Sequence, residues 1–350
     1  MSARHIFQSV WILITKAEFS VLSFPILMVT DEHRNRLLQS LEQFQSTVTN
    51  SAMPSYHSLT RFVNAFFDGF YPHFPLVHMP TFKLDDCEAE ILLAMAALGA
   101  QYQHEHRKGI VLFYASKAIL QGKVRERERR AIDRSISSES DSRHLANPKD
   151  DLPHNELMRE ARCALYLVAF GTWQREPEIE REAFNLQSFL ARCIRESRLE
   201  EGEEIAQHNT TDWHGWVEQE SHRRIKLFSF ALMNLQSIAF NVPPVILSDE
   251  IHLRLPSSCI EWLVPCREKW SMIRSSGFRE QIMLQDALSH MPRGSQEPNF
   301  FDSQAPPSPL ANYILLHALI QRILLIHRVF PNRRDGVEHP LLQCQKEEIR

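Results

Sequence analysis

"EAEILLAMAALGAQYQ", residues 88–103, is the stretch that decides the fold class. A helix over these residues is apolar nearly all round, and such a helix has to lie inside a protein rather than on its surface. The 350-residue chain around it holds only 10 glycines and no series of strand-like segments. Because strand-rich folds depend on glycine at their turns, the sequence predicts an all-α, multi-helical protein with this helix at its centre.

The apolar pattern upstream of this stretch predicts two more helices, over 31–48 and 56–70. Thr30 and Asp31 are candidate N-caps of the first helix. Its apolar stripe follows 4-3-4 spacing and consists of Leu37, Leu41, Phe44 and Val48. We interpret the stripe as core packing. Pairing of two chains in a coiled coil is the alternative, although the stripe covers under two heptads and a coiled coil needs about three or four.

Helical patterns recur downstream of the central helix. They begin near Gly109 and continue over 156–171, 178–198, 213–240, 265–275, 278–290 and 311–330. Two polar stretches, 135–155 and 291–309, are predicted to be long loops. We therefore expect a single domain over 55–335, with irregular proline-rich connections, and a C-terminal tail over 336–350.

Residues 1–54 are expected to form a poorly specified helical segment, or to result from a wrongly placed gene start. Residues 6–29 resemble a membrane span at first sight. Lys16 and Glu18 interrupt them, and the longest strictly apolar run is 10–14. A spanning helix needs about 20 mostly apolar residues, so we expect no membrane role for this segment.

The charge balance and the cysteines argue against several classes of protein. A net charge of −4 gives no global sign of nucleic-acid binding, because domains that grip phosphates usually carry a basic excess. The six cysteines form no CxxC and no finger-like pattern with histidines, so we expect reduced, buried thiols inside the cell. The chain has no P-loop, GxSxG or HExxH. The acidic run at 85–88 suits the start of a helix better than a magnesium site, and we predict neither a metal nor a catalytic residue.

Residues 66–82, "FFDGFYPHFPLVHMPTF", combine five phenylalanines, three prolines and two histidines. The prolines cannot continue a helix. A ligand pocket, a metal site and a structural hook are the alternatives. We favour a hook whose rings anchor a turn and whose histidines donate hydrogen bonds to backbone carbonyls. The candidate hook residues are Tyr71, Pro72, His73, Phe74, Pro75, His78, Pro80 and Phe82.

The segment "DWHGWVEQESHRRIKLF", residues 212–228, holds the sharpest polar pattern. Asp212 can cap a helix on which tryptophan, glutamate and arginine fall on one face. Glutamate four residues before arginine is the favourable order for an ion pair, and arginine can stack on tryptophan. A contact with an effector or partner is one interpretation, and a semi-buried ion pair that fixes helix packing is the other. The candidate residues are Trp213, Trp216, Glu220, Arg223 and Arg224.

A run of alternating charges, "KVRERERR", occupies residues 123–130. It is a candidate basic patch for nuclear import or phosphate binding. A solvated helix end with paired charges is the alternative interpretation. The candidate residues are Lys123, Arg125, Arg127, Arg129 and Arg130.

These segments, taken in order, resemble the fungal-specific transcription factor domain, the middle homology region of fungal zinc-finger regulators. Residues 66–82 are similar to the hook at the start of that domain, and "LLAMAALGAQY" is similar to its central helix. "DWHGWVEQESHRR" looks like its Trp-Glu-Arg-Arg segment, and "FNVPPVILSDEIHLRLP" looks like the loop that follows. "SPLANYILLHALIQRI" resembles the continuation in relatives with paired two-Cys, two-His fingers. The resemblance covers about 56–330.

The resemblance implies a regulatory domain that acts in RNA polymerase II transcription in the nucleus. Its implied partners are other transcription regulators or co-regulators, a second copy or a relative in a dimer, and a small-molecule effector. Relatives read DNA with a zinc module that has no counterpart in this chain, so zinc and DNA binding are expected only through a missing or partner module. The alternatives are a finger-less protein that dimerises with full-length relatives and modulates them and, third, a helical enzyme.

Overall fold

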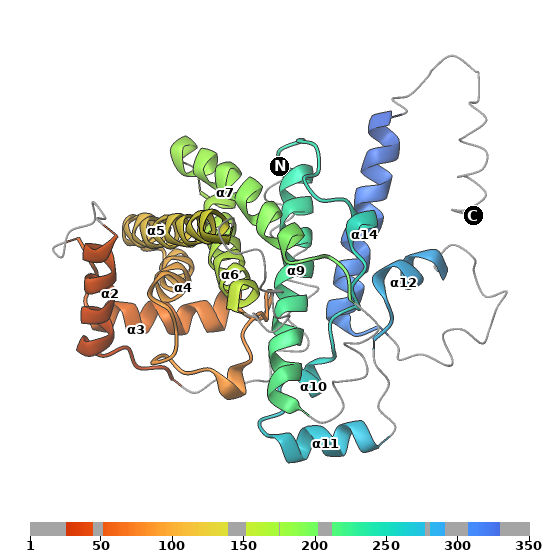
Figure 1. The fold of residues 1–350 in the computed structure, drawn as a ribbon, viewed down its shortest axis with the longest axis horizontal. Helices are drawn as coiled ribbons and strands as arrows, with labels where there is room; N and C mark the ends of the chain where they lie inside the picture. Colours follow the sequence, from red (N-terminus) through yellow and green to blue (C-terminus); the bar gives the residue numbers. More distant parts are fainter. Residues whose placement is uncertain are drawn as a thin grey trace. The chain divides into compact units, whose positions relative to one another are not determined.

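The computed structural model is all-α, which confirms the predicted fold class (Figure 1). It describes residues 26–44, 52–138, 152–174, 176–201, 212–276, 281–290 and 307–329. Within these residues the only strand-like pairings are two isolated bridges, between Glu200 and His252 and between Arg254 and Met283. Helices therefore carry the whole architecture of the described part.

The described residues fall into two compact units. The N-terminal unit consists of 26–75 and 82–197, and the C-terminal unit consists of 76–81 and the described residues from 198 onward. Six residues of the predicted hook thus belong to the C-terminal unit, although the chain on both sides of them belongs to the N-terminal unit. The domain bounds predicted from the sequence stay a prediction.

The N-terminal unit is built around the helix that the sequence places at its centre. Its helices are α2 (Asp31–Gln43), α3 (Tyr56–Ala65), the π-helical turn η1 (Phe66–Phe70), α4 (Ala89–Tyr102), α5 (His106–Ser138), α6 (Leu152–Thr172) and α7 (Pro177–Glu196). Every residue of α4 from Ala89 to Ala100 is buried. A Cβ atom at Gly99 would lie 1.7 Å from the carbonyl oxygen of Phe62, so α3 and α4 can approach this closely only because residue 99 is glycine.

The apolar stripe of α2 faces the core of its own unit. Thr30 caps the helix, and the Thr30 side chain and His33 form a reciprocal capping box. Leu37 and Leu41 are 0% and 2% exposed, so both are used inside the unit. The coiled-coil alternative is therefore wrong for these two positions. The helix ends at Gln43, earlier than predicted, and Val48 lies outside the described residues.

The loop predicted over 135–155 is shorter at both ends than the polar sequence suggested, whereas the end predicted for the loop 291–309 agrees with the start of α14 at Pro309. Helix α5 continues to Ser138, and α6 begins at Leu152, so both ends of the predicted loop 135–155 are helical. Residues 139–151 lie outside the described residues, as do 291–306. Polar composition marks a segment as solvated, but an exposed helix end is also solvated, and composition alone does not separate the two.

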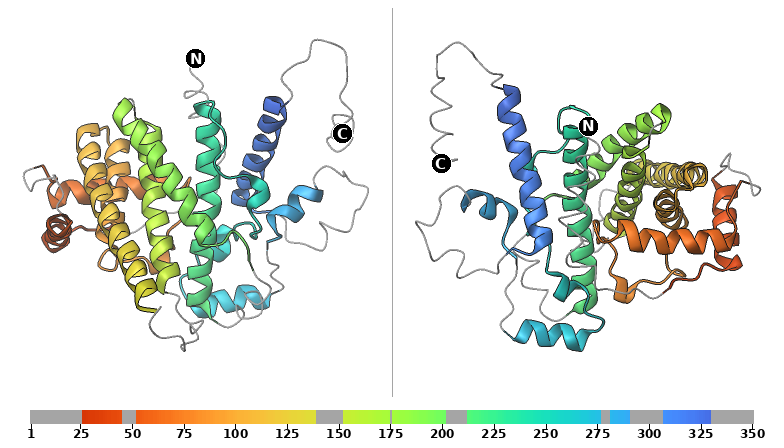
Figure 2. Two further views of the ribbon diagram at one scale, coloured as in Figure 1. Left: turned by 45° about the horizontal axis from the view of Figure 1, so that its top comes forward. Right: turned by 180° about the vertical axis from the view of Figure 1, so that it is seen from behind.

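The C-terminal unit is organised around a second central helix, α9 (Trp213–Ala239), which is buried from Arg224 to Ser237. Its other elements are η2 (Met79–Thr81), η3 (Ser248–Glu250), α10 (Cys259–Trp262), α11 (Arg267–Ser275), α12 (Leu284–His290) and α14 (Pro309–Val329). Helices α9 and α14 run side by side (Figure 2), and the Asn234 side chain donates to the carbonyl oxygen of His317 at 2.8 Å.

Helix α14 is the one described helix that is long and apolar enough to cross a membrane. Part of its apolar surface packs inside the protein, because 44% of an 18-residue apolar stretch within Pro309–Arg328 is buried. Leu310, Ile314 and Leu315 are among the residues packed in the core of the unit. Burial in the core accounts for the apolar character of the N-terminal half of this helix.

Candidate functional site

The aromatic residues of the hook pack mainly on one another inside the N-terminal unit. Phe70 and Phe74 stack with ring centroids 4.8 Å apart, and Phe67 lies 5.4 Å from Phe82. The π-helical turn that arranges them closes with a hydrogen bond from the Tyr71 N–H to the Phe66 carbonyl at 2.9 Å. These contacts are those of an architectural element, in which rings anchor a turn in the chain.

The two histidines of the hook lie in different units. His73 is buried in the N-terminal unit, and its backbone N–H donates to the Phe70 carbonyl at 3.0 Å. His78 belongs to the C-terminal unit, where its Nδ1 lies 2.9 Å from the Thr81 hydroxyl. Pro80 is exposed, whereas Pro75 is buried. The hook is therefore where the chain leaves one unit, contributes six residues to the other and returns.

His78 lies against tryptophans that come from distant parts of the sequence. Its ring centroid is 4.9 Å from that of Trp262 and 5.8 Å from that of Trp213. Burial, together with the positive charge of Arg224, lowers the pKa of His78 to about 4, and backbone groups of Val264 and Trp262 only partly oppose this. His78 is therefore a neutral core residue at neutral pH.

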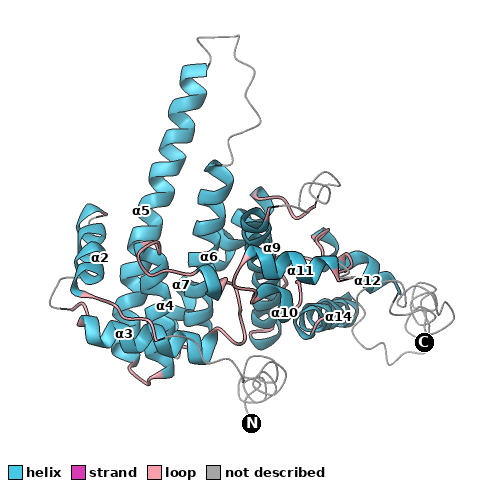
Figure 3. Ribbon diagram, turned by 90° about the horizontal axis from the view of Figure 1, so that it is seen from below, coloured by secondary structure: helices cyan, strands magenta, loops and turns pink. Residues whose placement is uncertain are grey.

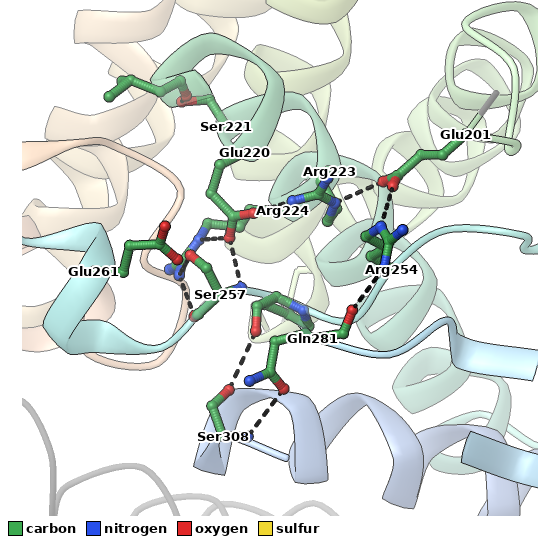
Figure 4. Close-up of polar contacts among 12 residues, drawn as sticks. Glu201, Glu220, Ser221, Arg223, Arg224, Arg254, Ser257, Glu261, Gln281 and Ser308 are labelled. Carbon is green, nitrogen blue, oxygen red and sulfur yellow. Dashed lines mark hydrogen bonds and ion pairs between the residues drawn. The ribbon is translucent and has the colours of Figure 1, made fainter. Parts of the chain in front are cut away.

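A fully buried ion pair lies at the start of α9 (Figure 4). The Arg224 Nε is 2.7 Å from a carboxylate oxygen of Glu220, and both side chains are 0% exposed. Glu220 also accepts a hydrogen bond from the Ser257 N–H at 2.9 Å, and Arg224 donates to the Ser257 carbonyl at 2.9 Å. The pair thus ties α9 to the irregular segment before α10.

The charges around this pair continue toward the surface. Arg223 contacts Glu220 and also lies 2.6 Å from Glu201, which is 3.9 Å from Arg254. Burial by itself raises the pKa of the Glu220 carboxyl, but the charges of Arg224 and Arg223 outweigh it and hold that pKa below its ordinary value. Glu220 is therefore ionised, and its negative charge compensates two arginines in the interior.

Four tryptophans and Val264 form a core cluster beside these charges, with Trp213, Trp216, Trp262 and Trp270 all buried. The guanidinium of Arg224 lies 4.2 Å from the ring centroid of Trp262, not against Trp216 on its own helix. Trp216 instead has Arg274 at 5.7 Å.

Arg274 of α11 links this tryptophan cluster to a second buried carboxylate. Its guanidinium lies 4.6 Å from the centroid of Trp270. Its Nε is 2.9 Å from Glu261, whose side chain is 1% exposed. The expected arginine–tryptophan stacking thus occurs, within α11 for Arg274 and Trp270 and between separate elements for Arg224 with Trp262 and Arg274 with Trp216.

Sequence reasoning missed Trp270, Glu261, Arg274 and Glu201 as members of this cluster. The available signal was the composition of the short segment 259–274, in which two tryptophans stand among glutamates and arginines. No periodicity connects that segment with α9, because the contacts depend on how the intervening chain returns.

The arrangement offers buried hydrogen-bond donors and cations. The indole N–H groups of Trp213, Trp262 and Trp270 are buried without a hydrogen-bond partner among the described residues. Within the same residues, no group of three or more His, Cys, Asp or Glu side chains is placed to hold a metal ion. The chemistry of the cluster is that of a rigid core in which charges and rings fix the position of α9.

The candidate basic patch on α5 divides into two sets. Lys123, Arg127 and Arg130 face neighbouring helices and lie 2.7, 2.8 and 3.1 Å from Glu90, Glu160 and Glu156. Arg125 and Arg129 are exposed. Lys123 and Arg127 therefore pair with buried glutamates and serve helix packing in the N-terminal unit, whereas Arg130, whose side chain is 54% exposed, forms an ion pair at the surface.

Comparison with known proteins identifies the family. The family model described as "Fungal specific transcription factor domain" matches residues 63–336. The chain is 26% identical over 208 residues to zinc finger protein klf1 of Schizosaccharomyces pombe, covering 58% of this chain and 24% of that protein. It is 22% identical over 297 residues to zinc finger protein zas1 of the same yeast, covering 82% of this chain and 30% of that protein.

The chain spans less than a third of the length of either relative. No solved structure matches it significantly. The family match extends over more than three quarters of the sequence and includes the hook, both central helices and the buried cluster. The chain therefore belongs to the family of fungal specific transcription factor domains.

Proposed function

We propose that this chain is the regulatory part of a nuclear transcription regulator that acts on RNA polymerase II genes. The observation that carries the proposal is the family match over 63–336, which reaches into both compact units. The names of the two relatives, which are zinc finger proteins, support it. This chain contains no CxxC. In this proposal DNA is therefore read by a zinc module supplied outside this chain.

Two of the candidate partner contacts lie mostly in the interior of the units. Four of the five candidate residues on α9 are buried and position α9 rather than meet a partner directly; they are Trp213, Trp216, Glu220 and Arg224. The apolar stripe of α2, which motivated a finger-less dimerising protein, has Leu37 and Leu41 inside the unit. A domain of this kind influences transcription by presenting surfaces to other regulators, with its buried charges fixing which surface is presented.

A tethering experiment tests the proposal. The full chain is fused to a heterologous DNA-binding domain in a fungal cell, and a reporter with the matching sites is measured. We expect the fusion to change reporter output relative to the DNA-binding domain alone, and a fluorescent fusion of the chain to be found in the nucleus.

Matched variants give this experiment its control. Glu220→Gln, which unbalances the buried cluster, should lose the effect on the reporter. Glu218→Gln, an exposed position on the same helix, should keep it. A fusion that folds, enters the nucleus and leaves the reporter unchanged would contradict the proposed function.

A further inference from the structure

One face of the C-terminal end of α5 combines cations and apolar side chains in helical register. Arg125, Arg129, Ile132 and Ile136 follow 4-3-4 spacing, which places them on one side of the helix. We call these four residues the α5 face. Ile132 is 58% exposed and Ile136 is 66% exposed, while both arginines are also exposed. Figure 3 shows this end of α5 extending beyond the start of α6 in the same unit.

The two arginines of the α5 face differ from the other cations of the same segment. Lys123, Arg127 and Arg130 each contact a glutamate of α4 or α6. Arg125 contacts only the carbonyl of Gln121 on its own helix, and within the described part of the chain neither Arg125 nor Arg129 has a carboxylate partner. The α5 face therefore presents positive charge that the neighbouring helices do not neutralise.

The composition of the α5 face selects among classes of partner. Two isoleucines in helical register gain by contact with an apolar surface, and they gain nothing from the phosphates of a nucleic acid. A second copy in parallel would set arginine against arginine. An antiparallel copy would set arginine against isoleucine, and the exposed carboxylate nearest this face, Asp133, stands beside it rather than on it. An amphipathic helix with an apolar stripe and acidic flanks satisfies both parts of the surface.

We propose that the α5 face is a docking surface for an acidic amphipathic helix of another protein. The partner helix lies along α5, with its apolar residues at 3–4 spacing against Ile132 and Ile136. Its carboxylates reach Arg125 and Arg129 on the same side. This surface is separate from the buried cluster of α9, and no residue of that cluster takes part in it.

A binding measurement tests the proposal on the full chain. The probe is a fluorescein-labelled helical peptide of about 18 residues, with leucines at 3–4 spacing and glutamates beside them. We expect saturable binding by fluorescence anisotropy that weakens as salt rises from about 50 to 300 mM. A peptide with lysine in place of every glutamate, and a scrambled peptide of the same composition, should bind at least about tenfold more weakly.

Variants of exposed residues locate the site without unfolding the protein. Arg125→Glu with Arg129→Glu, and Ile132→Ser with Ile136→Ser, should each weaken binding about tenfold. The matched controls are Arg267→Glu and Met272→Ser on α11, which are equally exposed and should leave binding unchanged.

Four outcomes of the binding measurements would overturn the proposal, and a fifth, from a deletion variant, would do so as well. The four are equal binding of the scrambled peptide, unchanged binding by the α5 variants, competition by duplex DNA with loss in the arginine variants alone, and no binding of the acidic peptide. Enhanced binding after deletion of residues 139–151 would instead identify that segment as the occupant and would also overturn the proposal of a separate partner.

Discussion

The charged segments of α5 and α9 contain the same residue types in opposite environments. In α9, Glu220 and Arg224 pair along one helix and are fully buried. In α5, Arg127 and Arg130 pair with glutamates of α6, although glutamates stand beside them in their own helix. Tryptophans of α10 and α11 cover the start of α9, whereas the end of α5 extends past its neighbours.

The comparison teaches that spacing along a helix gives the pairs that can form, and packing decides which of them do. Packing also decides how much each ion pair contributes to the stability of the protein. An exposed ion pair contributes about 0–1 kcal/mol, whereas removal of one partner from a buried pair costs about 3–5 kcal/mol. Removal of one charged partner should therefore lower the free energy of unfolding far more in α9 than at an exposed position of α5.

The largest effect is expected from Glu220→Gln. This change removes the negative charge that Arg223 and Arg224 contact inside the protein. We expect the free energy of unfolding to fall by about 3–5 kcal/mol in urea titrations at neutral pH. Glu218→Gln, exposed on the same helix, should change it by less than about 0.5 kcal/mol. Equal effects of the two variants would show that the pair is not buried in solution.

A pH dependence follows from His78. Its pKa is about 4 in the folded protein against 6.5 in the unfolded chain, so the unfolded chain binds more protons between these values. The contribution of neutral His78 is fully present above pH 6.5 and is lost as the pH falls toward 4. Between pH 6.5 and 5 the loss should reach about 2 kcal/mol, followed by tryptophan fluorescence during unfolding.

The matched comparison for this pH dependence is His78→Gln against His252→Gln. His78→Gln should remove the uptake of about one proton on unfolding and so flatten the dependence of the free energy of unfolding on pH. His252→Gln, at an exposed position, should leave that dependence unchanged. His317 also titrates at low pH, because burial lowers its pKa to about 3, and some slope should therefore remain in His78→Gln.

A moderate and a very small effect are expected on α5, from Arg127→Ala and Arg125→Ala respectively. Arg127 compensates Glu160, which is 6% exposed, so its removal should cost about 1–3 kcal/mol in urea titrations. Arg125 is exposed and contacts no carboxylate among the described residues, so its removal should cost less than about 0.5 kcal/mol. A reversed order would mean that the end of α5 packs differently in solution.

Much of the fold could be predicted from local patterns. The helices predicted over 178–198 and 213–240 are observed as Pro177–Glu196 and Trp213–Ala239. The helix predicted over 56–70 is present, with its last turn widened into a π-helix. Apolar periodicity and caps are written into neighbouring residues, which is why these elements could be located.

The candidate site was predictable only in part. The i and i+4 order of Glu220 and Arg224 pointed to their contact, because both stand on one helix. The stacking of Arg224 on Trp262 joins α9 to α10, and the contact of Arg274 with Trp216 joins α11 to α9, whereas Arg274 and Trp270 stand four residues apart on α11. Nothing in the local sequence states that Arg224 meets Trp262 or that Arg274 meets Trp216, because these contacts join separate helices.

The sequence by itself determined the fold class, the positions of the main helices and the buried character of α4, because these follow from the composition and spacing of adjacent residues. Only the tertiary structure decided that the hook passes six residues to the C-terminal unit, with His78 against Trp262, and that Lys123 and Arg127 serve packing while Arg125 stays exposed. Such outcomes depend on contacts between residues far apart in the chain, whose formation is set by the packing of whole helices.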